Sequence, residues 1–181
     1  MDIQALVITM IHMNAQNKPQ AFEVNNIEAP AYWGLGILWT MLATAEDTNG
    51  AYSCIEQLIP QGPSAGPHIH EIAQETFYIL EGEATFFIED EPVKGTAGSF
   101  ISIPPGTKHA FQVDSETVRF INTYVPAGFE HVIMATTVPA EARTLPPSVS
   151  FPTQEEARKV LESVVEKYPA AKTTYLEGFT D

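Results

Sequence analysis

Three of the five histidines and one glutamate have types and spacings that could bind a metal ion. His68 and His70 are two residues apart, so in an extended segment their imidazoles project from the same side. Glu75 begins the next predicted strand, and His109 begins another one farther along the chain. Three imidazole nitrogens and a carboxylate oxygen suit a divalent first-row metal and leave positions free for water, substrate or dioxygen. Taken singly, each residue would more often be a core histidine or a surface carboxylate.

Short runs rich in Val, Ile, Thr and aromatic residues must position these side chains. Between Gly34 and Ala135, turn residues separate the runs about every ten positions, which is the pattern of an all-β protein. Within residues 83–89, apolar and polar side chains alternate, as in a strand with one buried face. Many short strands need their edges covered, and this favours a jelly-roll β-barrel.

The pattern predicts eight antiparallel strands. They are expected at residues 36–44, 51–59, 74–80, 83–89, 99–103, 109–113, 117–125 and 129–135. Asn49 and Gly50 stand between the first two, and this dipeptide supplies the positive φ angles of a tight hairpin turn. We therefore expect a hairpin there.

We divide the chain into three parts: an N-terminal arm at 1–31, a barrel domain at 32–140, and a Pro-rich linker with a C-terminal helix at 141–181. Thr153 and Glu156 have the spacing of a capping box at the start of that helix. The helix carries one apolar stripe, so we expect it to pack on the barrel, over its mouth or over the outer face of a sheet.

Composition excludes several classes of protein. The chain has 181 residues, and 23 acidic against 9 basic residues give a net charge of -14, which argues against nucleic acid and anionic membranes as partners. No apolar run approaches the ~20 residues that span a bilayer. The single Cys54 cannot form an internal disulfide, which fits the cytoplasm. The apolar residues 5–11 lack the preceding positive charge of a signal peptide. We expect them to pack on a neighbouring chain in a homodimer.

Two motifs surround the predicted ligands. The first runs Gly62, five residues, His68-Ile69-His70, four residues, Glu75, six residues, Gly82. The second runs Gly98, five residues, Pro104, one residue, Gly106, two residues, His109. Together they resemble the two motifs of the cupin superfamily. That family's second motif usually ends in Asn four residues after the histidine, and here Val113 takes this place.

The resemblance implies an all-β fold, a cupin jelly-roll β-barrel with a C-terminal α-helix. It also implies one divalent transition metal ion per chain, which could be Fe, Ni, Co, Mn, Cu or Zn. The implied ligands are His68, His70, Glu75 and His109. The Asn that Val113 replaces is not a ligand in the family, so the ligand set is complete.

Beyond the motifs, the layout resembles the small single-domain cupins called quercetinase-like. The shared features are Tyr32-Trp33, Glu75-Thr-Phe-Tyr-Ile-Leu-Glu-Gly82, Pro126-Ala-Gly-Phe129 and a C-terminal helix with Tyr168. Quercetinases open flavonols with dioxygen and release carbon monoxide, with the glutamate as base. The resemblance implies a metal-dependent dioxygenase that acts on a flavonol-like or other enolisable or aromatic small molecule, with Glu75 as the catalytic residue.

Aromatic side chains are expected inside the barrel as the pocket for this substrate. The phase of Glu75 and His109 along their strands indicates Phe77, Phe86 and Phe111, and Phe120 is added by hypothesis. Aromatic rings also fill barrel interiors that bind nothing.

Two other functions stay open on the same site. One is a metal-dependent isomerase, epimerase or decarboxylase, for which only Lys108 and Arg119 could hold a sugar phosphate. The other is a cupin that binds a small molecule without converting it.

Overall fold

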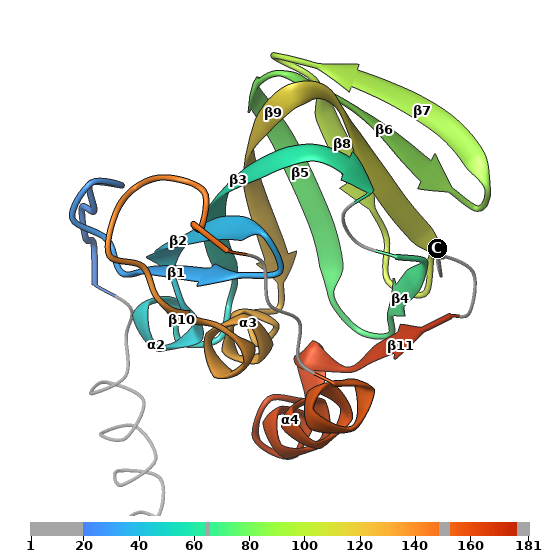
Figure 1. The fold of residues 1–181 in the computed structure, drawn as a ribbon. Coiled ribbons are helices and arrows are strands. Elements are labelled where there is room, and N and C mark those ends of the chain that lie inside the picture. Colours follow the sequence, from blue (N-terminus) through green and yellow to red (C-terminus); the bar gives the residue numbers. More distant parts are fainter. Residues whose placement is uncertain (1–19, 64–65, 149–152, 177–181) are drawn as a thin grey trace, which may run out of the picture.

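The structure is a computed structural model that describes residues 20–63, 66–148 and 153–176. Within these residues, eleven strands pair antiparallel in one continuous sheet that curls around the core (Figure 1). The strands are β1 (Ala31–Gly34), β2 (Ile37–Ala43), β3 (Ser53–Pro63), β4 (His68–His70), β5 (Gln74–Glu81), β6 (Glu83–Ile88), β7 (Glu91–Thr96), β8 (Phe100–Ile103), β9 (His109–Val125), β10 (Val138–Pro139) and β11 (Thr173–Tyr175). The helices are α2 (Ala45–Thr48), α3 (Glu130–Thr136), α4 (Gln154–Lys167) and the 3-10 turn η1 (Pro169–Ala171).

Strand β9 connects the two sides of the barrel. Its first half pairs with β6 and places His109 opposite His68 of β4. Its second half pairs with β3 and β5 and places Tyr124 opposite Glu75. A straight strand of 17 residues would be roughly 55 Å long, so the strand must bend for both ends to reach the same site. Figure 1 shows this arch at the top of the barrel.

The bend explains why one strand was predicted as two. The run 114–116 is polar and reads as a loop in the sequence, yet it remains extended. The Asp114 carboxylate accepts a hydrogen bond from the Thr85 hydroxyl at 2.6 Å. The Ser115 hydroxyl accepts one from the Glu83 backbone N–H at 2.8 Å. These polar side chains therefore stabilise the bent part of β9 instead of interrupting it.

Five other predicted strands are confirmed as β2, β3, β5, β6 and β8, with ends that differ by a few residues. The predicted strand at 129–135 is wrong, because this segment forms α3. The Glu130 carboxylate accepts the backbone N–H groups of Gly128 at 2.7 Å and Ala45 at 2.8 Å, which joins the start of α3 to α2. The helix buries Val132 and Ile133. The short strands β1, β7, β10 and β11 were not predicted, and β4 was expected only as an extended segment.

The hairpin predicted at Asn49 and Gly50 is also wrong. Strands β2 and β3 do pair antiparallel, but helix α2 stands between them. Asn49 has φ of 53° and ends this helix in the left-handed conformation, and Gly50 follows with φ of 77°. A tight hairpin and a helix C-terminus both require positive φ, so the dipeptide alone does not distinguish them.

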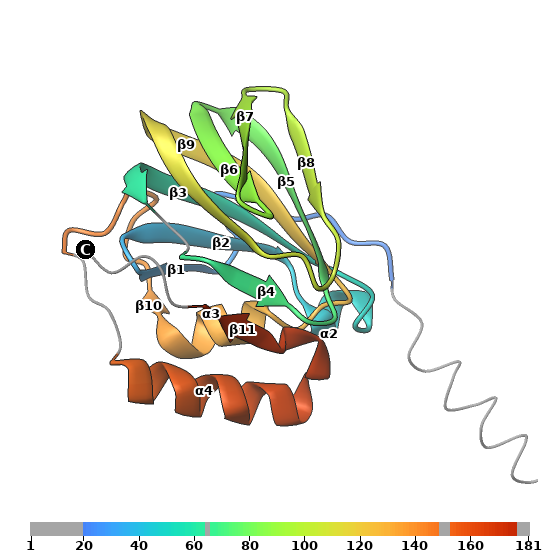
Figure 2. The ribbon, with the colours of Figure 1, turned by 90° about the vertical axis from the view of Figure 1, so that its right-hand side faces the viewer.

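The predicted capping box of α4 is confirmed. The Thr153 hydroxyl accepts from the Glu156 backbone N–H at 3.3 Å, and the Glu156 carboxylate accepts from the Thr153 backbone N–H at 2.9 Å. The helix has its main contacts with α3 and η1. In Figure 2, α3 and β11 lie between α4 and the remaining strands. Residues 1–19 of the predicted arm and 149–152 of the linker lie outside the described part of the chain, and the three-part division stays a prediction.

The core lies inside the curled sheet, and the alternation of β5 shows how it forms. Phe77 and Ile79 are at most 2% exposed, whereas Tyr78 and Leu80 are 43% and 38% exposed on the outer face. At the end of this strand Gly82 has φ of 83°, and a Cβ atom there would lie 2.3 Å from the Thr117 carbonyl oxygen. Only glycine fits this turn.

Candidate metal centre

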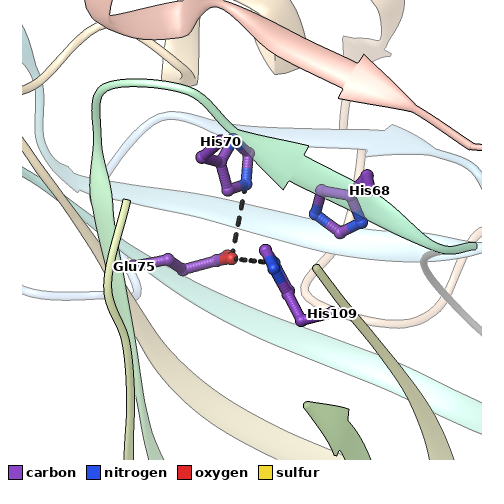
Figure 3. Close-up of side chains that lie close together, drawn as sticks. All are labelled: His68, His70, Glu75 and His109. Carbon is purple, nitrogen blue, oxygen red and sulfur yellow. Dashed lines mark hydrogen bonds and ion pairs between the residues drawn. The ribbon is translucent and has the colours of Figure 1, made fainter. Parts of the chain in front are cut away.

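Four buried side chains converge at one end of the barrel. His68 and His70 come from β4, Glu75 from the start of β5 and His109 from the start of β9. One ligand atom from each lies within 4.8 Å of those of the others (Figure 3). Among the residues that the structure describes, this is the one such group of three or more histidine, cysteine or carboxylate side chains. The structure therefore brings together the four predicted ligands.

The short strand β4 can position two of the ligands because three other segments, β9, β11 and the turn before His109, bind to it. His68 lies opposite His109 of β9 on one edge, and His70 lies opposite Thr173 of β11 on the other. The His70 carbonyl also accepts the backbone N–H of Gly106, from the Pro104-Pro105-Gly106 turn, at 2.8 Å. Both imidazoles consequently point to the same side, as the two-residue spacing requires.

Glu75 faces two of the histidines with one carboxylate oxygen. Oε2 lies 2.9 Å from His109 Nε2 and 3.3 Å from His70 Nε2. The other oxygen, Oε1, accepts a hydrogen bond from the Asn122 side-chain amide at 2.9 Å. Asn122 in turn accepts one from Gln57 at 2.8 Å. These partners hold the carboxylate in place without occupying the oxygen that faces the histidines.

Each histidine is anchored through its outer nitrogen, Nδ1. The acceptor is the Gly66 carbonyl for His68 at 2.7 Å and the Thr107 carbonyl for His109 at 2.9 Å. For His70 the partner is the Thr173 hydroxyl, at 2.9 Å. A carbonyl only accepts, so Nδ1 of His68 and His109 carries the proton, and in the neutral rings Nε2 bears the free lone pair. Such outer hydrogen bonds orient and fix the tautomer of metal-binding histidines.

Burial and mutual charge shift the titration of the cluster. Burial, with the nearby His109, lowers the pKa of His68 to about 4. Burial alone would raise the pKa of Glu75, but His70 and the hydrogen bond from His109 outweigh it and hold this pKa well below its usual value. Burial likewise opposes the charge on His109, yet the bond to Glu75 raises its pKa. These shifts favour a charged His109 beside the Glu75 carboxylate and a neutral His68.

The donor set fits a divalent transition metal. His70 Nε2 is buried and has no hydrogen-bond partner, because its 3.3 Å approach to Glu75 lacks hydrogen-bond geometry. A buried nitrogen of this kind is costly unless something else binds it. Three imidazole nitrogens and one carboxylate oxygen supply ligands of the type that such a metal accepts. The cluster is thus consistent with a metal site.

The four predicted pocket residues lie in the packed core. Their rings contact one another with centroid distances between 5.1 and 5.8 Å, and none is more than 6% exposed; they are Phe77, Phe86, Phe111 and Phe120. This is the packing of a barrel interior. Their role as a substrate pocket stays a prediction.

Other aromatic side chains, which the sequence did not single out for this role, contact the histidines directly. The Tyr124 and Phe129 rings lie 5.2 and 4.8 Å from His70, and Tyr175 stacks near His68 at 5.9 Å. Burial and then the nearby Glu75 raise the pKa of Tyr124 well above its usual value, so its phenol remains neutral. Tyr175 is 60% exposed and stands at the outer side of the site.

Asn122 is a polar residue of the site that sequence reasoning missed. It sits between Phe120 and Tyr124 on the inward face of β9 and is fully buried. A lone amide in an otherwise apolar alternation was the available signal, because a buried amide needs partners. At Val113, where the family has Asn, the side chain is 2% exposed and belongs to the apolar core.

Comparison with known proteins agrees with this geometry. The family model described as "Cupin domain" matches residues 55–124, which include all four clustered side chains. This chain contains a cupin domain. The fold of the cupin is mostly antiparallel β with a C-terminal helix, as predicted.

Quercetin 2,3-dioxygenase of Bacillus subtilis is 28% identical to this cupin over 109 residues, which are 60% of this chain and 32% of that protein. An uncharacterized protein of Methanocaldococcus jannaschii is 33% identical over 60 residues, 33% of this chain and 48% of that protein. The chain thus spans less than half the length of either relative. The likeness to quercetin 2,3-dioxygenase is distant.

Solved structures show the same fold. A predicted oxalate decarboxylase of Thermotoga maritima has a TM-score of 0.53 and 24% identity, covering 58% of this chain and 99% of that one. A nucleoside dehydratase of Streptomyces has a TM-score of 0.51 and 18% identity, covering 60% and 84%. These similarities concern the fold alone. In the described part of the chain, no helix is long and apolar enough to cross a membrane.

Proposed function

We propose that this cupin is a metal-dependent dioxygenase that acts on a flavonol-like or other enolisable or aromatic small molecule. One observation carries the proposal: three buried imidazoles and one carboxylate turn ligand atoms toward one point, and each is anchored from behind. The 28% identity to quercetin 2,3-dioxygenase supports this reaction over others.

Glu75 is the proposed general base. A divalent ion held by the four side chains would act as a Lewis acid with free positions for a substrate oxygen and for dioxygen. The low pKa of Glu75 keeps its carboxylate ionised at neutral pH, as a metal ligand must be. To act as base, Glu75 would stretch or leave the metal, and Oε2 would then be free to accept the proton of a substrate hydroxyl. Asn122 holds Oε1 during this transfer.

The aromatic residues beside the histidines fit a flat substrate. The ring of Phe129 stands edge-on to His70 and is only partly buried, and Tyr175 is exposed next to His68. Together with Tyr124 they form an aromatic boundary on which a planar ring could stack. The neutral phenol of Tyr124 can donate a hydrogen bond but cannot act as a base.

Sugar phosphates fit this site poorly. Lys108 Nζ pairs with Asp90 at 2.5 Å. Arg119 pairs with Glu56 at 2.5 Å and with Glu81 at 3.6 Å. The two cations that could have held a phosphate are therefore already engaged by carboxylates. This weakens the alternative of an isomerase or epimerase for phosphorylated sugars.

Oxygen uptake tests the proposal. Protein reconstituted separately with iron, nickel, cobalt or manganese is measured against quercetin and a panel of catechols and diketones. Uptake that depends on metal and disappears in Glu75→Gln, but persists in the control Glu71→Gln, is the expected result, because Glu71 is exposed. Conversion of a substrate without oxygen uptake would indicate an isomerase or decarboxylase instead, and tight binding without conversion would indicate a binding protein. The homodimer and the cytoplasmic location stay predictions.

A further inference from the structure

Strand β11 brings a residue from the C-terminal segment into contact with the ligand cluster. It lies beside β4, with Thr173 opposite His70 and Tyr175 opposite His68. All three of its residues follow the matched cupin domain, which ends at residue 124. Figures 1 and 2 show β11 next to β4, although these strands are about a hundred residues apart in the chain.

Two backbone hydrogen bonds flank this strand and hold it in register. The Glu71 N–H donates to the Lys172 carbonyl at 3.0 Å, and the Leu176 N–H donates to the Pro67 carbonyl at 2.9 Å. Just before the strand, Ala171 is fully buried. Thr173 itself is 6% exposed, whereas its neighbour Thr174 is exposed.

The Thr173 hydroxyl determines which nitrogen of His70 carries the proton. Its oxygen lies 3.0 Å from the Ala171 carbonyl, which can only accept, so the single hydroxyl hydrogen points there. The same oxygen lies 2.9 Å from His70 Nδ1 and can then only accept from it. Nδ1 of His70 consequently bears hydrogen, which leaves Nε2, the nitrogen that faces Glu75 at 3.3 Å, as the ligand atom.

We propose that Thr173 is a positioning residue of the metal centre, which holds His70 in the tautomer and ring orientation that bind the ion. His68 and His109 use backbone carbonyls of their own connecting loops for this purpose. His70 alone among the three depends on a side chain, and that side chain comes from outside the cupin domain. The C-terminal segment therefore contributes a residue to the site and does not only pack against the barrel. The inference rests on the proposed function, because it concerns affinity for the proposed metal.

Metal affinity measured on the full chain tests this proposal. Thr173→Val keeps the shape of the side chain and removes the hydroxyl, and Thr173→Ser restores the hydroxyl. We expect Thr173→Val to weaken Co²⁺ binding, measured by competition with a chelator, by roughly 10- to 100-fold. Thr173→Ser should recover most of the affinity. Thr174→Val is the matched control on the same strand as Thr173. It removes an exposed hydroxyl that donates a hydrogen bond to Glu71, and this variant should bind Co²⁺ like the wild type.

A second readout does not depend on the metal. Nitrogen NMR of the metal-free protein distinguishes the two tautomers, and the His70 signals are assigned by their loss in His70→Gln. We expect hydrogen on Nδ1 in the wild type and in Thr173→Ser, and a mixture of tautomers in Thr173→Val. Thermal unfolding verifies that each variant is folded at the temperature used.

The outcomes separate the two proposals. Unchanged Co²⁺ affinity and an unchanged tautomer in Thr173→Val would overturn the role of Thr173 and leave the metal site standing. A wild type that binds none of the metals would overturn the proposed function. In that case the tautomer measurement still decides whether Thr173 orients His70, and a wild-type ring with hydrogen on Nε2 and none on Nδ1 would refute it.

Discussion

The two ends of the barrel interior are built from the same strand faces and are both buried, but they differ in the polarity of their side chains. On β5, Glu75 and Phe77 are neighbours on the inward face, and on β9 His109 is followed there by Phe111. One end is an apolar cluster of mutually packed rings, and the other consists of polar side chains that each have an anchor. Burial stabilises the first end directly, whereas it is costly at the second unless partners compensate. Stability and chemistry are therefore separated along the same strands, and each end can be altered by itself.

Removal of a ligand should produce the largest effect at the polar end. We expect His68→Ala to lose more metal affinity than the roughly 100-fold that loss of an outer hydrogen bond costs. The neutral His68 makes no bond to Glu75, so its removal leaves no unpaired buried charge and the barrel stays folded. Metal content by atomic emission and folding by circular dichroism measure the two effects.

His131→Ala is the control for that experiment. His131 lies on α3, stacks on Tyr168 and is not a member of the cluster, so metal content should be unchanged. Equal metal loss in the two histidine variants would contradict the assignment of His68 as a ligand.

Truncation of a core ring, unlike removal of a ligand, should lower stability and leave metal binding intact. Phe86 is fully buried, and Phe86→Ala is expected to lower the free energy of unfolding by about 3–5 kcal/mol through lost burial and a cavity. Urea unfolding measures this change. Phe100→Ala is the control, because the Phe100 side chain is 63% exposed. The folded fraction of Phe86→Ala should still bind one metal ion per chain. A folded variant unable to bind metal would show that the two ends are not independent.

Metal should in turn stabilise the whole barrel. A ligand that binds only the folded state at a hundred times its Kd adds about 2.7 kcal/mol to the free energy of unfolding. In a chain of this size, each kcal/mol raises Tm by roughly 2–4 °C. We therefore expect metal to raise the Tm of the wild type by the product of these two quantities, measured in thermal scans with and without metal. The same rise in His68→Ala would place the stabilising ion elsewhere.

The smallest effect is expected at Asn122, which lies on β9 between Phe120 of the apolar end and Tyr124 beside the histidines. Asn122→Ala leaves Glu75 Oε1 and the Gln57 amide without their partner, and this should cost about 1–3 kcal/mol of stability. Metal affinity should fall about tenfold, because the carboxylate is less well oriented. Gln74→Ala, which removes an exposed hydrogen bond to Ser102, is the control in both measurements. An Asn122 variant that matches this control would mean that Glu75 needs no such support.

The sequence predicted the ligand cluster better than its surroundings, for a physical reason. His68 and His70 are close in the chain, and period-two geometry with the motif spacing is enough to place them together. Asn122 and Thr173 act through contacts between segments that are far apart. Even the lone amide in the apolar alternation of β9 does not indicate which partners it has. The errors in the predicted fold have the same origin. Residues 129–135 contain β-branched and aromatic side chains and resemble a strand, and the buried Glu130 that joins the segment to α2 is a tertiary feature.

The bent strand β9 also has a consequence for the order of events during folding. Residues from both of its ends meet at the ligand cluster, and β4, β5 and β11 must be in place beside it. Closing such long loops costs entropy before any of these contacts forms, and topologies of this kind fold slowly. No short fragment of the chain contains the assembled ligand set. Metal uptake should therefore follow closure of the barrel, and its rate would report the last step of folding.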